Sequence, residues 1–462
     1  MGIRRMGIRR ILHVVHGYPP ESGGGTESYV SSLLAAQKEV GAEPLLLHGS
    51  FEPRPEVHLE ERTDLPHEAW RLHRADTYSD YWDRAHDPKV SALFEDFLGR
   101  TRPDLVHVHQ WIRLSDDLVQ RAERLGIPCV LSLHDLSISC PACFRQRPGG
   151  EHCERAPGFD SCADCVPLRG HESEAELRLG LRVFRENARA ALENARIVLA
   201  ATRSTASLVC RSLDLPEDLV RIEPFGLPRR FRDPPPFAPP ADGEPLRLAF
   251  WGLVTKRKGV EELCRALSLL RAEGPLDGRI EVHVFGRIDT EELERGLKDE
   301  ARGLPVRFHG RYEYAEIEAL RPHLACFPSS CFETYGLVLD EAFELGIPAL
   351  VTEVGAFAER LRGGGFLVPP NDPEALAAGL ARILEQPRLL AEAASRIPPP
   401  PPLLEEHARR LLALYEEAAA LPGRGGGGPS PSLRLELEWL RRCSATKGPP
   451  LRRGLDSTQP GL

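Results

Sequence analysis

The stretch at 324–342, Leu-Ala-Cys-Phe-Pro-Ser-Ser-Cys-Phe-Glu-Thr-Tyr-Gly-Leu-Val-Leu-Asp-Glu-Ala, predicts a buried strand, a loop and a helix. Gly336 permits close backbone approach just before the helix, which begins near Leu337. The first N–H groups of a helix are unpaired and carry the positive end of its dipole, so they suit a diphosphate. Glu333 precedes the turn and Glu341 lies one turn into the helix, which allows one carboxylate to meet sugar hydroxyls on each side of the phosphate. Two solvated glutamates flanking a helix start are the alternative interpretation.

Apolar runs alternate with helical patterns on both sides of this stretch. Strands are predicted at 11–15, 44–48, 104–109, 128–134, 197–200, 246–251, 280–285, 306–309, 324–328, 348–351 and 365–368. Helices are predicted between them, for example at 26–41, 116–125, 172–194 and 260–273. This alternation is typical of parallel α/β sheets, whose ligands bind beyond the carboxyl ends of the strands.

Composition shifts divide the chain into five parts. We expect an α/β domain at 1–226 with a Cys-rich insertion at 140–165, and a proline-rich linker at 227–245. A second α/β domain is predicted at 246–398 and a closing helix at 403–421. The Gly/Pro/Ser/Arg-rich tail at 422–462 predicts disorder, with a short helix at 433–442 as an alternative.

Charge and hydropathy exclude several classes of protein. The net charge of −9 provides no overall basic field for nucleic acid. No run of about 18 apolar residues is present, so no membrane span is predicted. The apolar run after the basic start is too short and wrongly flanked for a secretion signal. We therefore expect a cytoplasmic protein, with Arg229 and Arg230 as candidates for peripheral contact with the inner face of the membrane or as part of a solvated linker.

The two glutamates, with seven residues between them and Gly336 so placed, resemble the signature of the retaining GT-B glycosyltransferases, above all family 4, the glycosyl transferases group 1. This resemblance implies two Rossmann-like domains that face each other across a cleft. It implies a nucleotide-sugar donor (UDP-, GDP- or ADP-linked) and no cofactor for catalysis. It assigns Glu333 to the donor sugar, Glu341 to the ribose, and the amides from Tyr335 through Gly336 to Leu337 to the diphosphate.

Two further blocks of the second domain resemble the family. The segment 251–260, Trp-Gly-Leu-Val-Thr-Lys-Arg-Lys-Gly-Val, resembles the phosphate-binding loop, and Lys258 takes the role of neutralising the leaving diphosphate. Gly252 and Arg257 join the donor site on the same resemblance. Leu253 departs from it, because an arginine is common there, and Ala356 replaces the second glycine of a later block. A solvated basic turn is the alternative for the 256–258 segment.

The resemblance in the first domain is more generic. Gly24 and Gly25 lie in a Gly-rich loop before a predicted helix and are expected at the donor. The match places His134 against the donor sugar, whereas His109 and His16 follow strand ends on the expected acceptor side. A hydrogen-bonded structural histidine is the alternative for each.

Five cysteines fall in the 140–165 insertion. Paired C-x-x-C motifs in a reducing compartment suit a structural zinc ion. The related insertion of some family members implies Cys140, Cys153, Cys162 and Cys165 as ligands, with Cys143 spare. Two C-x-x-C pairs are the alternative set, and unligated thiols the other.

These patterns together predict a retaining hexosyltransferase that moves a sugar from a nucleotide-diphosphate sugar to a glycan or glycolipid acceptor in cell-surface polysaccharide synthesis. The alternative is a catalytically weak homologue that binds carbohydrate or acts in assembly, motivated by Leu253 and Ala356. An NAD-dependent dehydrogenase is disfavoured, because neither half shows the glycine fingerprint with its downstream acid.

Overall fold

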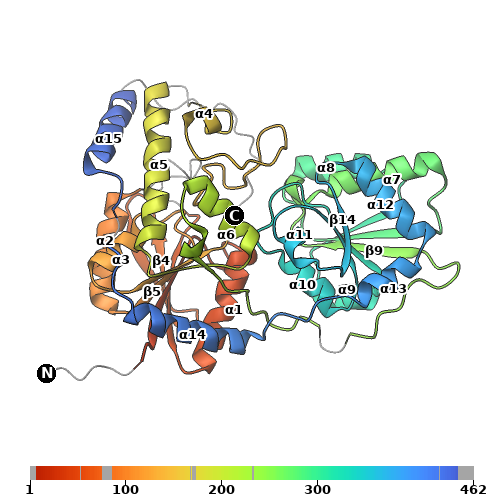
Figure 1. The fold of residues 1–462 in the computed structure, drawn as a ribbon, viewed down its shortest axis with the longest axis horizontal. Helices are drawn as coiled ribbons and strands as arrows, with labels where there is room; N and C mark the ends of the chain where they lie inside the picture. The colour runs from red at the N-terminus through yellow and green to blue at the C-terminus, as the bar shows by residue number, and fades with distance from the viewer. Residues whose placement is uncertain are drawn as a thin grey trace.

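A computed structural model describes residues 7–52, 54–74, 86–166, 168, 173–231, 234–425 and 427–445. Two lobes lie side by side, each with a central sheet covered by helices (Figure 1). The predicted fold class, two Rossmann-like α/β domains in the GT-B arrangement, is confirmed. None of the described helices combines the length and apolarity needed to cross a bilayer.

The N-terminal lobe contains an eight-stranded sheet in the order β3-β4-β2-β1-β5-β6-β7-β8, parallel except for the β3–β4 pair. Its strands are β1 (Arg10–Val15), β2 (Glu43–Gly49), β3 (His58–Arg62), β4 (Glu68–His73), β5 (Leu105–Val108), β6 (Cys129–Leu133), β7 (Ile197–Ala200) and β8 (Val220–Ile222). Its helices are α1 (Gly25–Glu39), α2 (Pro88–Thr101), α3 (Leu118–Arg124), α4 (Phe159–Cys162), α5 (Glu174–Asn194) and α6 (Arg203–Leu213).

Alternate residues of β1 face opposite sides of this sheet, as the two-residue period of a strand requires. Leu12 and Val14 pack in the core beneath α2, α3, α5 and α6. Ile11 and Val15 pack in a second core with α1 and α14 (Leu404–Ala420). The second core therefore joins a helix from the far end of the chain to the first strand.

The C-terminal lobe has a six-stranded parallel sheet in the order β11-β10-β9-β12-β13-β14. Its strands are β9 (Leu246–Trp251), β10 (Ile280–Phe285), β11 (Val306–Gly310), β12 (Leu324–Phe327), β13 (Ala349–Thr352) and β14 (Gly365–Val368). Its helices are α7 (Val260–Glu273), α8 (Glu291–Glu300), α9 (Tyr314–Leu320), α10 (Leu337–Glu344), α11 (Ala356–Arg360), α12 (Pro373–Glu385) and α13 (Arg388–Ala394). The strand order reverses between β9 and β12, where ligands of such sheets bind.

Two segments connect the lobes and run side by side. The amide of Leu227 in the outgoing segment donates to the carbonyl of Pro402 in the returning one, and Leu227 pairs with Leu403 as a parallel bridge. Helix α14 then crosses back under the N-terminal lobe (Figure 1).

Several elements differ from the sequence-based expectation. Strands β3 and β4 were not predicted, because their stretches lack a continuous apolar run. Helix α2 was also not predicted, although Val90, Phe94 and Phe97 stand at helical spacing. Helix α15 (Pro431–Ala445) replaces disorder in part of the tail and contains the short helix given as the alternative at 433–442; it lies beside α5 (Figure 1). Arg434 of α15 donates to Asn187 of α5 at 2.9 Å, which ties this helix to the lobe. Residues 446–462 of the predicted tail lie outside the described residues.

The C-terminal end of α14 is held by one buried guanidinium. Arg196 donates to the carbonyl of Leu421 at 2.7 Å and to both carboxylate oxygens of Glu123 at 3.1 Å. We expect Arg196→Lys to lower the free energy of unfolding by about 1–3 kcal/mol, because an ammonium loses the fork of charged hydrogen bonds. Thermal and denaturant unfolding measure this effect. Arg221→Lys is the control, since Arg221 pairs with Glu417 of the same helix in an exposed position, and an equal loss in both variants would contradict the prediction.

Candidate functional site

Lys258 and Glu333 meet at the carboxyl ends of β9 and β12. The Lys258 ammonium lies 2.6 Å from Oε1 of Glu333, and the Ser329 hydroxyl donates to the same oxygen at 2.6 Å. Burial disfavours the Lys258 charge, but the nearby Glu333 carboxylate outweighs it and raises the pKa of Lys258. The lysine therefore stays cationic at neutral pH, as a partner of a diphosphate must be.

Glu341 lies on the inner side of α10, and protein donors hold both of its oxygens. Trp251 donates its indole N–H to one oxygen at 2.7 Å, and the Tyr314 hydroxyl donates to the other at 2.8 Å. Burial raises the pKa of the Glu341 carboxyl, which these hydrogen bonds partly offset. Glu341 lines a cavity of about 440 Å³ together with Arg230 and Leu337. Because each carboxylate oxygen has two lone pairs, both oxygens keep the capacity to accept a second hydrogen bond.

The start of α10 is built for close approach. Gly336 has φ +77°, and a Cβ there would lie 2.5 Å from the Phe357 ring. Among the described residues, the amides of Tyr335, Gly336 and Leu337 donate no hydrogen bond. Arg360 donates to the Tyr335 carbonyl at 2.8 Å and lies over the Tyr335 ring at 3.7 Å. The loop is thus fixed through its carbonyls while its N–H groups stay available.

The neighbouring loops also require glycine. A Cβ on Gly259, which has φ +74°, would lie 1.9 Å from the carbonyl oxygen of Pro328. Gly252 has φ +121°. A Cβ on Gly286 would lie 1.7 Å from the carbonyl oxygen of Gly252. The turn after β9 is therefore pressed against the ends of both neighbouring strands, which places Lys258 beside Glu333.

Ala356, where the family more often has a glycine, contacts the backbone of Glu333. Its amide donates to the Glu333 carbonyl at 2.7 Å, and the residue is fully buried. The preceding Gly355 has φ +57°, and a Cβ on it would lie 2.4 Å from the same carbonyl. The close contact with the Glu333 carbonyl therefore requires glycine at position 355, the first glycine of the block, and not at position 356.

The Cys-rich insertion covers the donor loops from the N-terminal lobe. The Arg257 guanidinium stacks on Phe144 of the insertion at 3.8 Å, and Gln146 donates to the Ser330 carbonyl at 3.1 Å. Asn371 donates to the Gly150 carbonyl at 3.1 Å. A cavity of about 710 Å³ lies between the insertion and these loops. Arg257 is therefore directed toward the insertion, while Lys258 alone faces Glu333.

The Gly-rich loop of the N-terminal lobe faces the start of α10. A Cβ on Gly25 would lie 3.4 Å from the Leu337 side chain, and the Gly24 amide donates to Glu27 at 3.1 Å. His16 Nε2 lies 3.4 Å from Glu27 Oε1. Burial opposes ionisation of Glu27, but its contacts with His16 and Ser22 lower its pKa to about 2. The predicted donor glycines and Leu337 therefore come together, and His16 is drawn to Glu27.

His134 and His109 lie next to each other beneath the lobe junction. His109 Nδ1 is 2.8 Å from His134 Nε2, and the Thr334 hydroxyl of the other lobe donates to the His134 carbonyl at 2.7 Å. Burial lowers the pKa of His134 to about 3 and holds the pKa of His109 well below its usual range. Both rings are therefore neutral at physiological pH.

The insertion gathers four of its five thiols. Every pair among Cys140, Cys153, Cys162 and Cys165 is close enough to interact electrostatically, whereas Cys143 interacts with Asp135, Cys140 and Arg257. Burial raises the pKa of Cys162 to about 11. No three of these sulfurs lie within 4.8 Å of one another in the described part of the chain, so they are more open than a closed tetrahedral site.

Arg145 lies among the same thiols without a carboxylate partner in the regions that the structure covers. Its guanidinium is almost fully buried and donates to the carbonyls of Ser139 and Arg155. Burial lowers the pKa of Arg145, and Cys140, Cys153 and Cys162 act in the opposite direction. A buried cation of this kind favours an anionic group beside it, and a zinc ion with four thiolates carries a net charge of −2.

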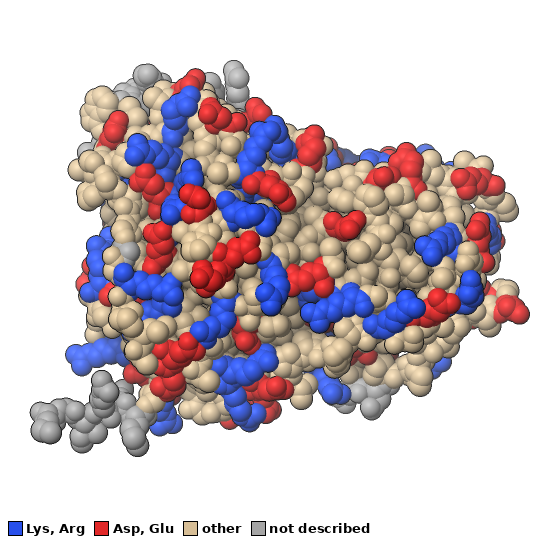
Figure 2. Space-filling model, viewed as in Figure 1, with Lys and Arg blue, Asp and Glu red and all other residues tan. Residues whose placement is uncertain are grey.

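Charged residues are mixed on the surface. Lys and Arg alternate with Asp and Glu across the face shown in Figure 2, without a broad basic area on that face. This distribution agrees with the net charge of −9.

The sequence-based reasoning missed the residues that hold the predicted ones in place. Ser329, Trp251, Tyr314 and Arg360 bind Glu333, Glu341 and the Tyr335 loop through side chains. Ser329 and Trp251 lie at strand ends within the two stretches that carry Glu333 and Lys258, so their positions in the sequence could have indicated them. Tyr314 and Arg360 carry no local signal, because only the tertiary fold brings them to the site.

Comparison with known proteins assigns both halves of the chain. Residues 23–228 match the family model Glycosyltransferase Family 4, and residues 245–386 match the model Glycosyl transferases group 1. Phosphatidyl-myo-inositol mannosyltransferase of Mycolicibacterium smegmatis is 35% identical over 167 residues, which cover 34% of this chain and 42% of that protein. The match thus spans less than half the length of that curated relative.

Solved structures share the two-lobed fold. Sucrose-phosphate synthase from Thermosynechococcus elongatus superposes with a TM-score of 0.56 at 19% identity, covering 95% of this chain and all of the other. Alr3699/HepE from Anabaena, in complex with UDP and glucose, gives a TM-score of 0.53 at 16% identity, covering 89% of this chain and 98% of the other. With both halves matched by family models and the fold shared, the chain belongs to the GT-B glycosyltransferases of family 4, the glycosyl transferases group 1.

Proposed function

We propose that this glycosyltransferase is a retaining enzyme that transfers a hexose from a nucleotide-diphosphate sugar to a glycan or glycolipid. The observation that carries the proposal is the 2.6 Å contact between Lys258 and Glu333, beside the unoccupied amides that begin α10. A cation, a carboxylate and a helix start converge there, which suits a diphosphate joined to a sugar.

In this proposal the donor spans the start of α10. The amides of Tyr335, Gly336 and Leu337 and the ammonium of Lys258 bind the diphosphate, while Glu341 accepts from the ribose in the 440 Å³ cavity. One oxygen of Glu333 accepts from the sugar hydroxyls, and the contact with Lys258 fixes the orientation of the Glu333 carboxylate. The likeness to a structure bound to UDP and glucose supports a uridine nucleotide, and guanosine and adenosine donors are the alternatives.

The proposed chemistry takes place on one face of the sugar. The bond from the anomeric carbon to the diphosphate oxygen breaks, and an acceptor hydroxyl forms the new bond on the same face. The hydroxyl proton passes to the leaving phosphate oxygen, so charge and atoms balance without another reactant. Lys258 and the helix start stabilise the negative charge that grows on the diphosphate. Glu333 is bound by Lys258 and Ser329, an arrangement that favours orientation of the sugar over nucleophilic attack.

The acceptor enters from the N-terminal lobe in this proposal, near Gly24, His109 and His134. The similarity to a phosphatidyl-myo-inositol mannosyltransferase supports a glycolipid or a related cell-surface glycan as acceptor. It also supports work at the inner face of the membrane, with Arg229 and Arg230 as candidate contacts. A weakly catalytic binding homologue is the alternative, with Leu253 and Ala356 as its motives.

We also propose that the insertion holds a structural zinc ion on Cys140, Cys153, Cys162 and Cys165. The mutual proximity of these thiols and the unpaired buried charge of Arg145 support this ligand set over two C-x-x-C pairs. Zinc would supply folding free energy to the insertion and keep Phe144 against Arg257. Catalysis in this proposal does not pass through the metal.

Removal of either charged partner is expected to abolish transfer. Lys258→Ala and Glu333→Ala should each lower kcat at least about a hundredfold, because each removes stabilisation from the diphosphate or the sugar in the transition state. Turnover of a panel of UDP-, GDP- and ADP-sugars with the purified protein measures this effect.

A matched ion pair provides the control. Lys298 and Glu294 also lie 2.6 Å apart, but on the exposed surface of α8. Lys298→Ala and Glu294→Ala should leave kcat unchanged. If Lys258→Ala or Glu333→Ala retained kcat within about threefold of wild type, the assignment would be withdrawn. Donor binding without turnover by the wild type, with every acceptor pool tested, would favour the binding homologue.

Metal content tests the zinc proposal independently of activity. The purified chain is expected to hold about one zinc ion, and Cys153→Ser should lose it because one thiolate of four is removed. Cys143→Ser should retain the ion. Elemental analysis measures the zinc content of the wild type and of each variant. Retention in Cys153→Ser together with loss in Cys143→Ser would instead support the two C-x-x-C pairs.

A further inference from the structure

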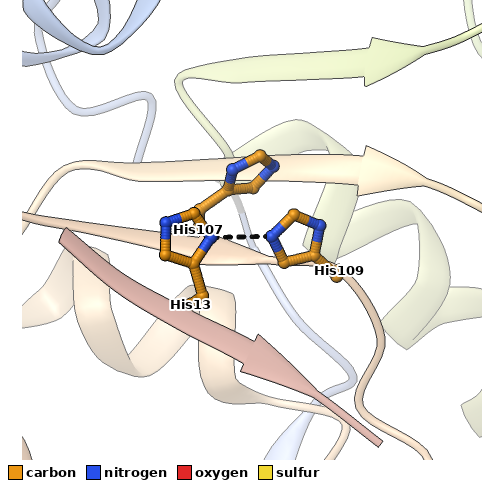
Figure 3. Close-up of side chains that lie close together, drawn as sticks. All are labelled: His13, His107 and His109. Atoms are coloured by element: carbon orange, nitrogen blue, oxygen red, sulfur yellow. Dashed lines mark hydrogen bonds between the residues drawn. The ribbon is translucent and has the colours of Figure 1, made fainter. Parts of the chain in front are cut away.

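Three histidines lie together inside the N-terminal lobe, beneath the ends of β1 and β5 (Figure 3). His13 and His107 are partners in the register of the β1–β5 pair, and His109 follows two residues later. The two-residue period of the strands turns all three toward the core with α1 and α14. His13 and His107 are completely buried, and His109 is nearly so.

Hydrogen bonds account for both ring nitrogens of each of these histidines. His13 bonds to Gln37 and His109, His107 bonds to Tyr415 and Ser132, and His109 bonds to His13 and His134. A metal ion would have to break these bonds, so the cluster is better explained as a hydrogen-bond relay.

The amide of Gln37 in α1 determines which partner donates in each hydrogen bond of the relay. Its amide N–H donates to the Tyr415 hydroxyl at 3.3 Å, and its carbonyl oxygen lies 2.7 Å from His13 Nε2. His13 Nε2 must therefore carry a proton, and a neutral imidazole has only one. His13 Nδ1 thus accepts from His109 Nε2 at 2.9 Å, and His109 Nδ1 accepts from His134 Nε2 at 2.8 Å.

His134 ends the relay at the lobe junction. With its proton on Nε2, its Nδ1 is left as a lone pair, and this nitrogen has no hydrogen bond to any residue that the structure describes. The hydrogen bonds of His107 are consistent with this direction. Because the Tyr415 hydroxyl accepts from Gln37, it donates its own proton to His107 Nδ1 at 2.7 Å, and His107 Nε2 then donates to Ser132 at 2.8 Å.

Rotation of the Gln37 amide by half a turn would reverse every bond of the relay. His134 would then carry its proton on Nδ1. Any mixed state would place two donors or two acceptors face to face in a buried site, which is costly. All these rings are neutral, since burial lowers the pKa of His13 to about 4 and that of His134 to about 3. The relay therefore has two states, and one amide selects between them.

We propose that Gln37 is a positioning residue that sets the tautomer of His134 through His13 and His109. His134 then offers a lone pair, and not an N–H, to a hydroxyl of the bound sugar. This role rests on the proposed function, in which His134 faces the donor sugar. Gln37 itself touches no substrate.

Nitrogen-15 spectra of the histidine-labelled full chain test the tautomer directly, with the His134 signals assigned by their loss in His134→Phe. The wild type is expected to show only the Nε2–H form of His134, and Gln37→Leu should show a mixture of both forms. A wild-type Nδ1–H form, or an unchanged single form in Gln37→Leu, would overturn the proposal. Gln120→Leu, which removes a glutamine bonded to Asn187 outside the relay, is the control and should leave the spectrum unchanged.

Gln37→Glu keeps the acceptor and provides the conservative variant. Its carboxylate should preserve the Nε2–H form and raise the pKa of His13, so the acid limb of the kcat profile should move up by about one pH unit. Activity would then be lost at a higher pH, as the relay takes up a proton. His16, Glu27, His407, Glu223 and Tyr29 also face His134 or its neighbours and are unchanged in this variant. An acid limb that coincides with that of the wild type would contradict the relay.

Turnover separates the two proposals. Gln37→Leu should lower kcat/KM about tenfold, as expected for one misdirected hydrogen bond at the site. If the wild type turned over no donor, the proposed function would fail, while the spectra would still decide the tautomer. If Gln37→Leu failed to fold in a thermal unfolding test, the acid limb of Gln37→Glu would still test the relay, because only a connected relay moves that limb.

Discussion

Strand β9 lies directly beside β12 in the second sheet, and the candidate site depends on this adjacency. Lys258 and Glu333 are 75 residues apart in the chain and touch because their loops leave neighbouring strand ends. The strand order reverses at this point, so the helices that follow the two strands diverge and leave room above the sheet. A helix start, a cation and a carboxylate therefore share one small region at the ends of these strands.

Backbone proximity is the second constraint. Gly259, Gly286 and Gly355 each lie where a side-chain carbon would overlap a carbonyl of a neighbouring loop. These contacts bring the loops closer than ordinary residues allow, and the side chains of Lys258 and Glu333 then meet without strain in their own backbones. Next to Gly355, the amide of Ala356 donates to the Glu333 carbonyl and ties the two loops together.

Much of this architecture could be predicted from local sequence. The apolar runs of the parallel strands and the glutamate pair around Gly336 were sufficient for the fold class and for the family. Strands β3 and β4 escaped prediction because their stretches are rich in polar residues and lack a continuous apolar run, as their place at the edge of the sheet allows. Tyr314, Arg360 and Gln37 escaped because each acts across the tertiary fold on a residue far away in sequence. His109 and His134 were noticed near strand ends, whereas His13 was not singled out, and the branch through His107 depends on Tyr415 of α14, which returns from the far end of the chain.

The pairing of Leu227 with Leu403 has a mechanical consequence. The chain crosses between the lobes twice, and both crossings run through one narrow two-stranded junction. A swing of one lobe against the other would therefore bend the chain at this junction. Because α14 travels with the N-terminal lobe, the swing would leave Tyr415 in place while it carried Lys258 and Glu333 away from Gly25.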